Sequence, residues 1–257
     1  SGKTVVAMIA AYKAVKSGYQ VAIMAPTAIL ATQHMEEFSK ILAPLGIKCE
    51  LLLGATTAKN KKDILERLQT GEIDVLIGTH ALITENVTFK NLGLVVTDEQ
   101  HRFGVKQRTA IAAKGNNPDT LVMTATPIPR TLHMSIVGVR DMSVIYEPPQ
   151  NRKPVQTYVL EYDEEVIKEA ITKELEREGQ VFYLFNRVEG IERKASEISN
   201  MVPEARVAVA HGKMSGTELE NIMADFIEKK IDVLICTTIL ETGIDIPNVN
   251  TLIIIDA

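Results

Sequence analysis

Two short stretches of the sequence combine residue types that suit the chemistry of phosphate groups. The first is Ser1-Gly2-Lys3-Thr4, which precedes the helical run VVAMIAAYKAVKSG. It matches the end of the pattern G-x-x-x-x-G-K-[ST], in which the lysine reaches the β- and γ-phosphates of a nucleotide and the hydroxyl binds Mg²⁺. Backbone N–H groups at the start of the helix would add donors for phosphate oxygens. Taken alone, the same four residues also fit an ordinary helix start.

An acidic pair is the second stretch. Asp98 and Glu99 follow the apolar run LGLVVT, and ligands of parallel sheets bind at the carboxyl ends of the strands. There Asp98 can orient Mg²⁺ through water, and Glu99 can position and deprotonate an attacking water, which are roles that phosphoryl transfer requires. A solvated acidic turn is the alternative, but the upstream Gly-Lys-Thr stretch favours catalysis. We therefore predict Lys3, Asp98 and Glu99 as catalytic residues, and Thr4 and Asp98 as Mg²⁺ ligands.

The elements that must position these residues are short apolar runs that alternate with longer amphipathic runs. This alternation is typical of a parallel sheet with helices on both faces. In the first half, the predicted strands are VAIMAP, CELLL, DVLIGT, LGLVVTDE and TLVMTAT, and the predicted helices include AILATQHMEEFSKIL and KNKKDILERLQT. In the second half, the strands are QVFYLFNR, ARVAVAH, DVLICTT and NTLIIIDA, and the helices are DEEVIKEAITKELERE, EGIERKASEISNM and SGTELENIMADFIEKK.

A proline-rich stretch, YEPPQNRKP, separates the two halves at residues 146–154. Proline restricts the residue before it and interrupts regular structure, so this stretch is predicted to be a linker. We therefore predict two α/β domains, residues 1–145 and residues 155–257, on either side of it. The two halves share an architecture, but the sequence gives no convincing repeat between them.

The composition bounds the classes of function. With 257 residues, of which 46% are hydrophobic and 24% charged, the chain can form two small globular domains. The net charge of −5 provides no general attraction to nucleic acid, so such a contact needs a local basic surface. We expect no membrane helix, because no uninterrupted apolar run reaches about 18 residues. Cys49 and Cys236 are predicted to be buried thiols in a reducing compartment. The five histidines lack the spacing of a zinc site.

Six stretches resemble the motifs of a known superfamily. They are, in order, SGKT, APTAILATQH, GTHALI, DEQH, TATPIPRT and TTILETGIDIP. As a set they closely resemble the motifs of superfamily 2 DNA helicases and translocases, and the resemblance covers the whole chain. DEQHRFGVKQR and TATPIPRTL are similar to the branch that holds RecG and the bacterial transcription-repair coupling factor. The resemblance implies two RecA-like domains, each a mainly parallel sheet flanked by helices, with ATP and Mg²⁺ bound between them. It also implies an ATP-driven motor on double-stranded or branched DNA that acts in repair or recombination.

Further site residues follow from this resemblance. Gln100 and His101 would link the catalytic pair to the cleft between the domains, and Ser1, Gly2, Gly243 and Asp245 would contact ATP. The stretch Thr124-Ala125-Thr126 resembles the motif that couples hydrolysis to domain movement. Residues that resemble segments facing the nucleic-acid backbone are Pro26, Thr27, Gly78, Thr79, His80, Arg130, Thr237 and Thr238. Hydroxyls and backbone N–H groups suit phosphate oxygens and read no base sequence. Any one of these threonines can equally be a plain cap at the end of a strand.

The two halves resemble different members of the branch. SGKTVVA, LLLGATTAKNKK and DEQHRFGVKQR are similar to RecG, whereas HMSIVGVRDMSVI, YLFNRVEGIERKA and ETGIDIPNVNTLIIIDA are similar to the coupling factor. The change falls near residues 120–133, where the two kinds of protein are alike. This pattern suggests a chimera of a RecG-like first domain and a coupling-factor-like second domain. A natural relative with mixed features is the competing hypothesis.

Both ends of the sequence fall inside motifs of the superfamily. The first half of the phosphate-binding pattern does not precede Ser1, and TLIIIDA comes before the segment in which the superfamily carries its arginines. We therefore expect a trimmed motor core that binds nucleotide weakly and hydrolyses it slowly. The resemblance further implies a monomer in the bacterial cytoplasm, with RNA polymerase as a partner only through other domains.

Three other functions are weighed against the motor. A catalytically inactive two-domain module that binds DNA or a protein is the main alternative, and the intact DEQH stretch argues against it. A motor that acts on RNA is the second, and the DEQHRFGV and TATPIPRTL stretches favour DNA instead. A P-loop kinase or small GTPase is the third, which the paired α/β halves disfavour.

Overall fold

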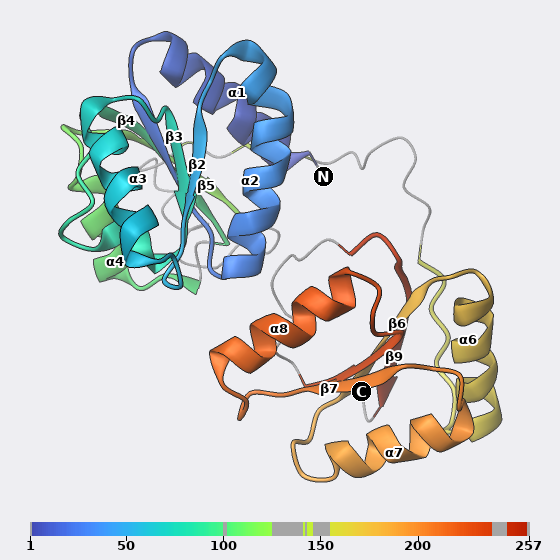
Figure 1. Ribbon diagram of the computed structural model, residues 1–257. Coiled ribbons are helices and arrows are strands. Elements are labelled where there is room, and N and C mark those ends of the chain that lie inside the picture. Colours follow the sequence, from blue (N-terminus) through green and yellow to red (C-terminus); the bar gives the residue numbers. More distant parts are fainter. Residues whose placement is uncertain are drawn as a thin grey trace. The chain divides into compact units, whose positions relative to one another are not determined.

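The structure is a computed structural model that divides into two compact units, Ser1–Pro154 and Val155–Ala257 (Figure 1). It describes residues 2–99, 102–124, 141, 143–145, 155–237 and 246–255. The predicted linker, residues 146–154, lies outside this described part. No helix within the described ranges is both long and apolar enough to cross a membrane.

The first unit is built on a five-stranded parallel sheet with helices on both faces. The strands pair in the order β2-β3-β1-β4-β5. They are β1 (Gln20–Met24), β2 (Cys49–Leu52), β3 (Val75–Gly78), β4 (Leu92–Asp98) and β5 (Asp119–Met123). The helices are α1 (Lys3–Lys16), α2 (Ala28–Leu42), α3 (Ala58–Thr70) and α4 (Val105–Ala112), with 3₁₀ turns η1 (Ala43–Leu45) and η2 (His80–Ile83). Helices α1 and α2 cover one face of the sheet, and α3 and α4 cover the other (Figure 1).

Burial explains which runs of the first unit become central strands. Every residue of β1 and β3 is buried, as expected for strands covered on both faces. Only Leu52 is fully buried in the edge strand β2. Ile64 and Leu68 of α3 are four residues apart, so they lie on one face of the helix and join the core above the sheet.

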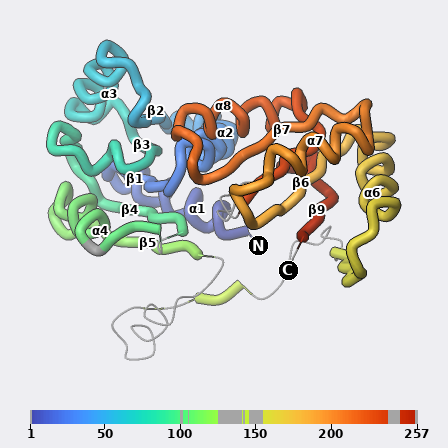
Figure 2. The backbone as a smooth tube through the Cα atoms, turned by 90° about the horizontal axis from the view of Figure 1, so that it is seen from below, coloured from blue at the N-terminus to red at the C-terminus, as the bar shows by residue number. Residues whose placement is uncertain are grey.

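The second unit repeats this plan on a four-stranded parallel sheet with the order β7-β8-β6-β9. Its strands are β6 (Gln180–Phe185), β7 (Val207–Ala210), β8 (Val233–Cys236) and β9 (Val249–Ile255). Its helices are α6 (Glu164–Glu176), α7 (Ile191–Met201) and α8 (Gly216–Ile227). The tube in Figure 2 follows the alternation of strand and helix through each unit, from α1 to β5 and from α6 to β9. The two parallel sheets confirm the predicted fold class.

The two sheets contain an internal repeat that is not evident from the sequence alone. Exchanging β2, β3, β1 and β4 for β7, β8, β6 and β9 converts one strand order into the other. The equivalent strands β3 and β8 then carry IDVLIGT and IDVLICT, which differ only at Gly78 and Cys236. The shared strand order agrees with the architecture predicted for both halves, and one short matching run does not amount to a sequence repeat between them. This run lies in one strand, and it gains meaning only when the strand order makes β3 and β8 equivalent.

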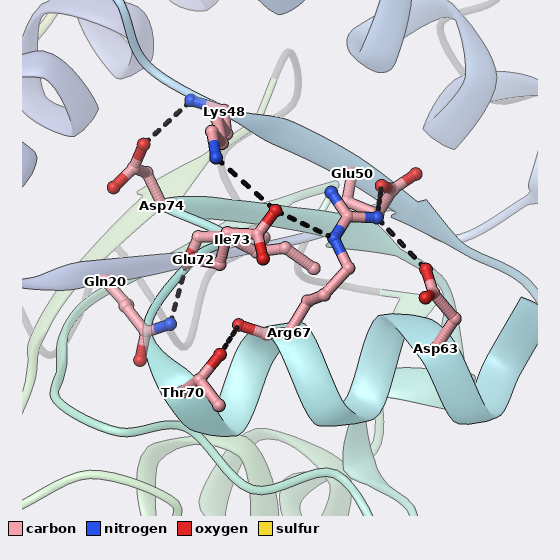
Figure 3. Close-up of polar contacts among 9 residues, drawn as sticks. All are labelled: Gln20, Lys48, Glu50, Asp63, Arg67, Thr70, Glu72, Ile73 and Asp74. Atoms are coloured by element: carbon pink, nitrogen blue, oxygen red, sulfur yellow. Dashed lines mark hydrogen bonds and ion pairs between the residues drawn. The ribbon is translucent and has the colours of Figure 1, made fainter.

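A buried glutamine joins the amino ends of the strands in the first unit (Figure 3). Gln20 begins β1, and its Nε2 donates to the carbonyl oxygens of Leu68 at 2.9 Å and Ile73 at 2.7 Å. Its Oε1 accepts from the backbone N–H groups of Lys90 at 2.7 Å and Asn91 at 3.0 Å. One side chain thus satisfies four backbone groups at this end of the sheet.

Charged side chains surround the same end (Figure 3). Arg67 of α3 donates to Glu50 of β2 at 2.9 Å, to Asp63 at 3.2 Å and to Glu72 at 3.2 Å. Glu72 also accepts from Lys48 at 3.4 Å. Hydrogen bonds from Lys48 and Arg67 lower the pKa of Glu72 below its usual value. These partly exposed pairs tie α3 to the sheet at the edge opposite the carboxyl ends of the strands.

Gln180 takes the place of Gln20 in the second unit, with only half of the hydrogen bonds. Its Nε2 donates to the carbonyl oxygens of Phe226 at 2.6 Å and Ile231 at 2.7 Å. Its Oε1 is buried and has no hydrogen-bond partner among the described residues. The sequence explains one of the two missing bonds, because Pro247 stands where the first unit has Lys90, and proline has no N–H to donate.

Both cysteines are free thiols, but they differ in burial. Cys236 in the central strand β8 is 1% exposed, and burial raises the pKa of its thiol to about 12. Cys49 is only partly buried, which corrects the expectation of two buried thiols, because it lies in the edge strand β2. Desolvation still raises the pKa of Cys49 to about 11.

Candidate active site

The carboxyl edge of the first sheet gathers most of the described candidate residues. All five strands are parallel, so the segments that follow them leave the sheet at the same edge. Along the strand order, these segments begin at Leu53 after β2, Thr79 after β3, Ala25 after β1, Glu99 after β4 and Thr124 after β5. The acidic pair therefore lies between the segment that follows β1 and the segment that follows β5.

Asp98 is the last residue of β4, and both of its carboxylate oxygens have partners. Oδ1 accepts from the backbone N–H of Glu99 at 2.9 Å. Oδ2 lies 3.0 Å from Nε2 of His34, a buried residue of α2. With 9% of its surface exposed, Asp98 is almost withdrawn from water, and these two contacts fix the plane of the carboxylate.

Glu99 combines a buried side chain with an unusual backbone. It is 7% exposed, and its φ of 45° lies in the left-handed region that residues other than glycine rarely adopt. Thr124, directly after β5, donates from its hydroxyl to Glu99 Oε2 at 3.3 Å. A backbone outlier of this kind is typical of functional sites. The contact brings together two motifs that are 25 residues apart in the sequence.

The start of α1 provides the predicted phosphate-binding element. Gly2 is the N-cap of α1 with a φ of 77°, a left-handed conformation that suits glycine. Lys3 and Thr4 form the first turn of the helix and are partly exposed. The first four N–H groups of a helix have no partners within it, so this end offers donors to an anion. Helix α1 packs against β1 and β4, the strand that ends in Asp98.

The candidate nucleic-acid contacts lie in the segments after β1, β3 and β8. Thr27 is the N-cap of α2, and its Oγ1 accepts from the N–H of Leu30 at 3.3 Å. The plain-cap interpretation therefore holds for Thr27, although its hydroxyl hydrogen is still able to donate. Pro26 beside it is partly exposed. Thr79 is buried before η2, whereas His80 is exposed and lies near Gly54.

Gly78 at the end of β3 is required by close packing. A Cβ atom there would lie 2.1 Å from the carbonyl oxygen of Leu52 and 2.2 Å from Cδ1 of Leu82. The glycine thus allows β2 and β3 to meet directly below Thr79. In the second unit, Thr237 follows β8 at the equivalent place, is 7% exposed, and donates its N–H to the carbonyl oxygen of Ala210 at 3.2 Å.

A lysine holds the segment that follows η2. Nζ of Lys114 donates to the carbonyl oxygens of Thr84 at 2.8 Å and Val87 at 2.7 Å. Desolvation lowers the pKa of Lys114. This side chain follows α4 and therefore connects the segment after the acidic pair with the segment after His80.

Several sequence-predicted residues cannot be placed. Ser1, Gln100, His101, Arg130, Thr238, Gly243 and Asp245 lie outside the described residues, together with Ala125 and Thr126. In contrast, His34 is a site residue that sequence reasoning did not single out, although it stands within the APTAILATQH motif. Its contact with Asp98 spans 64 residues of sequence, so only the fold reveals it.

Family comparisons agree with the motifs. Residues 1–135 match the family described as DEAD/DEAH box helicase, and residues 163–257 match the helicase conserved C-terminal domain. The chain is 54% identical to the transcription-repair-coupling factor of Bacillus subtilis (strain 168) and 50% identical to that of Staphylococcus aureus (strain USA300). Each match covers 100% of this chain and 22% of the relative, so the chain spans about a fifth of their length. Because one relative matches both halves, these matches give no support to the chimera hypothesis.

Solved structures show the same relationship. The structure of RecG bound to a three-way DNA junction has a TM-score of 0.82 and 42% sequence identity, and the match covers 98% of this chain and 34% of that chain. Dbp5 of S. cerevisiae, bound to RNA and ADP BeF3, matches 96% of this chain and 66% of its own with a TM-score of 0.68 and 20% identity, which shows the fold alone. The chain therefore belongs to the DEAD/DEAH box helicases of superfamily 2, in the branch that holds RecG and the transcription-repair coupling factor.

Proposed function

We propose that the chain is the motor core of an ATP-dependent helicase or translocase that acts on double-stranded or branched DNA in repair or recombination. The observation that carries this proposal is the acidic pair at the end of β4. Asp98 is held through both oxygens, and Glu99 is turned by a left-handed backbone toward Thr124. The similarity to a coupling factor and to RecG supports DNA as the substrate.

The donor set fits the proposed cofactors. Mg²⁺ prefers oxygen ligands, and Thr4 and Asp98 offer a hydroxyl and a carboxylate from elements that pack together, α1 and β4. The first turn of α1 with Lys3 would bind the phosphates of ATP, whose γ-phosphate is the group transferred to water. Glu99 would take the proton of the attacking water. Through its hydrogen bond, Thr124 would couple the position of the Glu99 carboxylate to the segment that follows β5.

The nucleic-acid contacts would use short donors at the carboxyl edge of each sheet. Thr27, Thr79 and, in the second unit, Thr237 each follow a strand, where a hydroxyl or a backbone N–H group can meet a phosphate oxygen. Such contacts do not distinguish one base from another, as a motor that moves along DNA requires. We further propose that residues 146–154 join domains 1–145 and 155–257, and that the motor acts as a monomer.

The test is ATP hydrolysis with and without duplex DNA. It compares this chain with a version extended at both ends to include the flanking segments of the coupling factors. We expect the extended version to hydrolyse ATP faster with duplex DNA than without it, and the stimulation to fall steeply with salt. Glu99→Gln in the same protein should bind nucleotide and lose hydrolysis by about 10²–10⁴-fold.

Two outcomes would overturn the proposal. The first is no DNA-dependent hydrolysis in either protein while both bind DNA, which would favour the inactive binding module. The second is equal stimulation by structured RNA and by duplex DNA, which would indicate an RNA motor.

A further inference from the structure

His34 lies in the second turn of α2 and contacts Asp98 directly. Its Nε2 is 3.0 Å from Asp98 Oδ2, and both residues are buried, with 6% and 9% of their surfaces exposed. The ring of His34 also packs edge-on against Phe38, one turn further along α2, with 6.3 Å between ring centroids. A polar contact this far from water is costly to break, because each group would lose its partner.

The surroundings of His34 fix the position of its proton. An ionised carboxylate only accepts hydrogen bonds, so Nε2 must be the donor toward Asp98. Nδ1 is buried and has no hydrogen-bond partner within the described ranges. An N–H at Nδ1 would be a buried donor without an acceptor, whereas a bare ring nitrogen there costs less. These contacts favour the tautomer with its proton on Nε2, aimed at Asp98.

Helix α2 connects this contact to the edge of the sheet. The helix begins at the Thr27 cap and continues without interruption through Ala28–Leu42. A continuous helix moves as a unit, so a displacement at Thr27 also displaces His34, two turns away. Thr27 and Pro26 are proposed nucleic-acid contacts, and Asp98 is a proposed Mg²⁺ ligand. A single helix thus joins the two proposed sites of the first unit.

We propose that His34 is a positioning residue that orients the Asp98 carboxylate for Mg²⁺ and links that orientation to the start of α2. This inference rests on the proposed function. Groups that hold a metal ligand in place through a hydrogen bond tune the affinity for the metal. The alternative is that His34 only packs in the core beside Phe38. Its loss would then change the melting temperature and leave the Mg²⁺ requirement unchanged.

Three variants, made in the version extended at both ends, separate these possibilities. His34→Leu keeps an apolar body and removes the donor to Asp98. His34→Gln keeps an N–H donor of similar reach. Phe38→Leu is the matched control, because it disturbs the same packing on the same helix and leaves the donor intact. For each protein we would measure the Mg²⁺ concentration that half-saturates binding of a fluorescent ADP analogue, together with the melting temperature.

The proposal predicts a specific order of effects. His34→Leu should raise the required Mg²⁺ concentration by about 10–100-fold, while His34→Gln restores it to within about threefold of the wild type. Phe38→Leu should lower the melting temperature and leave the Mg²⁺ requirement unchanged. Long-range ¹H–¹⁵N spectra of the wild type should show His34 with its proton on Nε2, assigned by loss of the signals in His34→Gln.

The contrary outcomes are distinct. If His34→Leu and Phe38→Leu change only the melting temperature, His34 is a packing residue and the inference is wrong, whereas the proposed function stands. A proton on Nδ1 in the spectra would overturn it as well. If the extended wild-type protein shows no Mg²⁺-dependent nucleotide binding, the proposed function and the inference are both overturned.

Discussion

At the carboxyl end of β4 the first unit carries Asp98, and at the equivalent place on β9 the second unit carries Ile255. The register establishes this equivalence, because Val21 pairs with Leu94 and Val181 pairs with Thr251, each four residues before the position compared. The two units therefore share the order of four strands, to which the first unit adds β5. Within the described residues, which stop at Ile255, only the first unit ends this strand with a carboxylate. The comparison teaches that the sheet supplies a place for chemistry, and single residues at the strand ends decide whether any occurs.

The largest expected effect tests whether the chemistry belongs to the first unit. Asp98→Asn should lower DNA-stimulated ATP hydrolysis at least about 100-fold, because a charge held against Mg²⁺ is worth several kcal/mol. Ile255→Val is the control at the equivalent position, and it should leave the rate within about twofold because it removes one methyl group from a partly buried side chain. Steady-state hydrolysis with duplex DNA measures both. Comparable losses in the two variants would contradict the assignment of the chemistry to one unit.

The next effect concerns the one position at which the shared β3 and β8 sequences differ. Gly78→Cys should destabilise the first unit by about 3 kcal/mol, because the new Cβ would meet the backbone of Leu52. The reciprocal change, Cys236→Gly, should cost about 2 kcal/mol through lost burial and added chain freedom. Hydrogen exchange of the strand amides measures each unit separately. If Gly78→Cys is tolerated, β2 and β3 do not meet as closely as described.

The two glutamines at the amino ends of the sheets provide a smaller contrast. Gln20→Leu leaves four backbone groups without their hydrogen-bond partner and should destabilise the first unit by about 2–3 kcal/mol. Gln180→Leu leaves two carbonyl groups without their donor and should destabilise the second unit by about 1–2 kcal/mol. Protection of β1 and β6 against hydrogen exchange is the measurement. Equal losses would show that Gln180 Oε1 has a partner after all.

The smallest effect depends on pH. Partial burial by itself raises the pKa of Asp232, but hydrogen bonds from the Arg206 side chain and backbone outweigh it and leave the pKa below its usual value. A carboxyl with a lowered folded pKa stabilises the protein above its unfolded pKa of about 4, and this contribution is lost as pH falls further. Asp232→Asn should therefore cost about 1 kcal/mol or less at pH 7, because Arg206 is mostly exposed.

Urea unfolding at pH 7 and near pH 3 measures this difference. The gap between wild type and Asp232→Asn should narrow at the lower pH. A gap that stays constant would show that the ion pair contributes nothing. In the first unit, Asp74 accepts the equivalent backbone bond from Lys48 at 2.8 Å, while the Lys48 ammonium turns to Glu72. Arg206 thus supplies to the second unit a side-chain bond that the first unit lacks.

Local pattern predicts the elements of this protein well and their long-range contacts poorly. Helix α2 occupies the predicted residues, Ala28–Leu42, because its apolar positions recur at helical spacing after a threonine cap. Helix α4 was not predicted, since VKQRTAIA has no clear apolar face. The acidic pair is predictable from the sequence, because the proposed phosphoryl transfer requires carboxylates directly after a strand. The contact of His34 with Asp98 depends on how α2 lies against the end of β4, which no local pattern contains.

The left-handed backbone at Glu99 lowers the stability of the first unit at a position where the proposed hydrolysis of ATP needs a carboxylate. A glycine would adopt this conformation without strain, and the present glutamate costs about 1 kcal/mol there, besides the burial of its carboxylate. Stability alone would therefore favour glycine at this position, whereas the proposed role of Glu99 requires its carboxylate. A redesign guided by stability alone would therefore improve the fold at this position and remove the proposed general base.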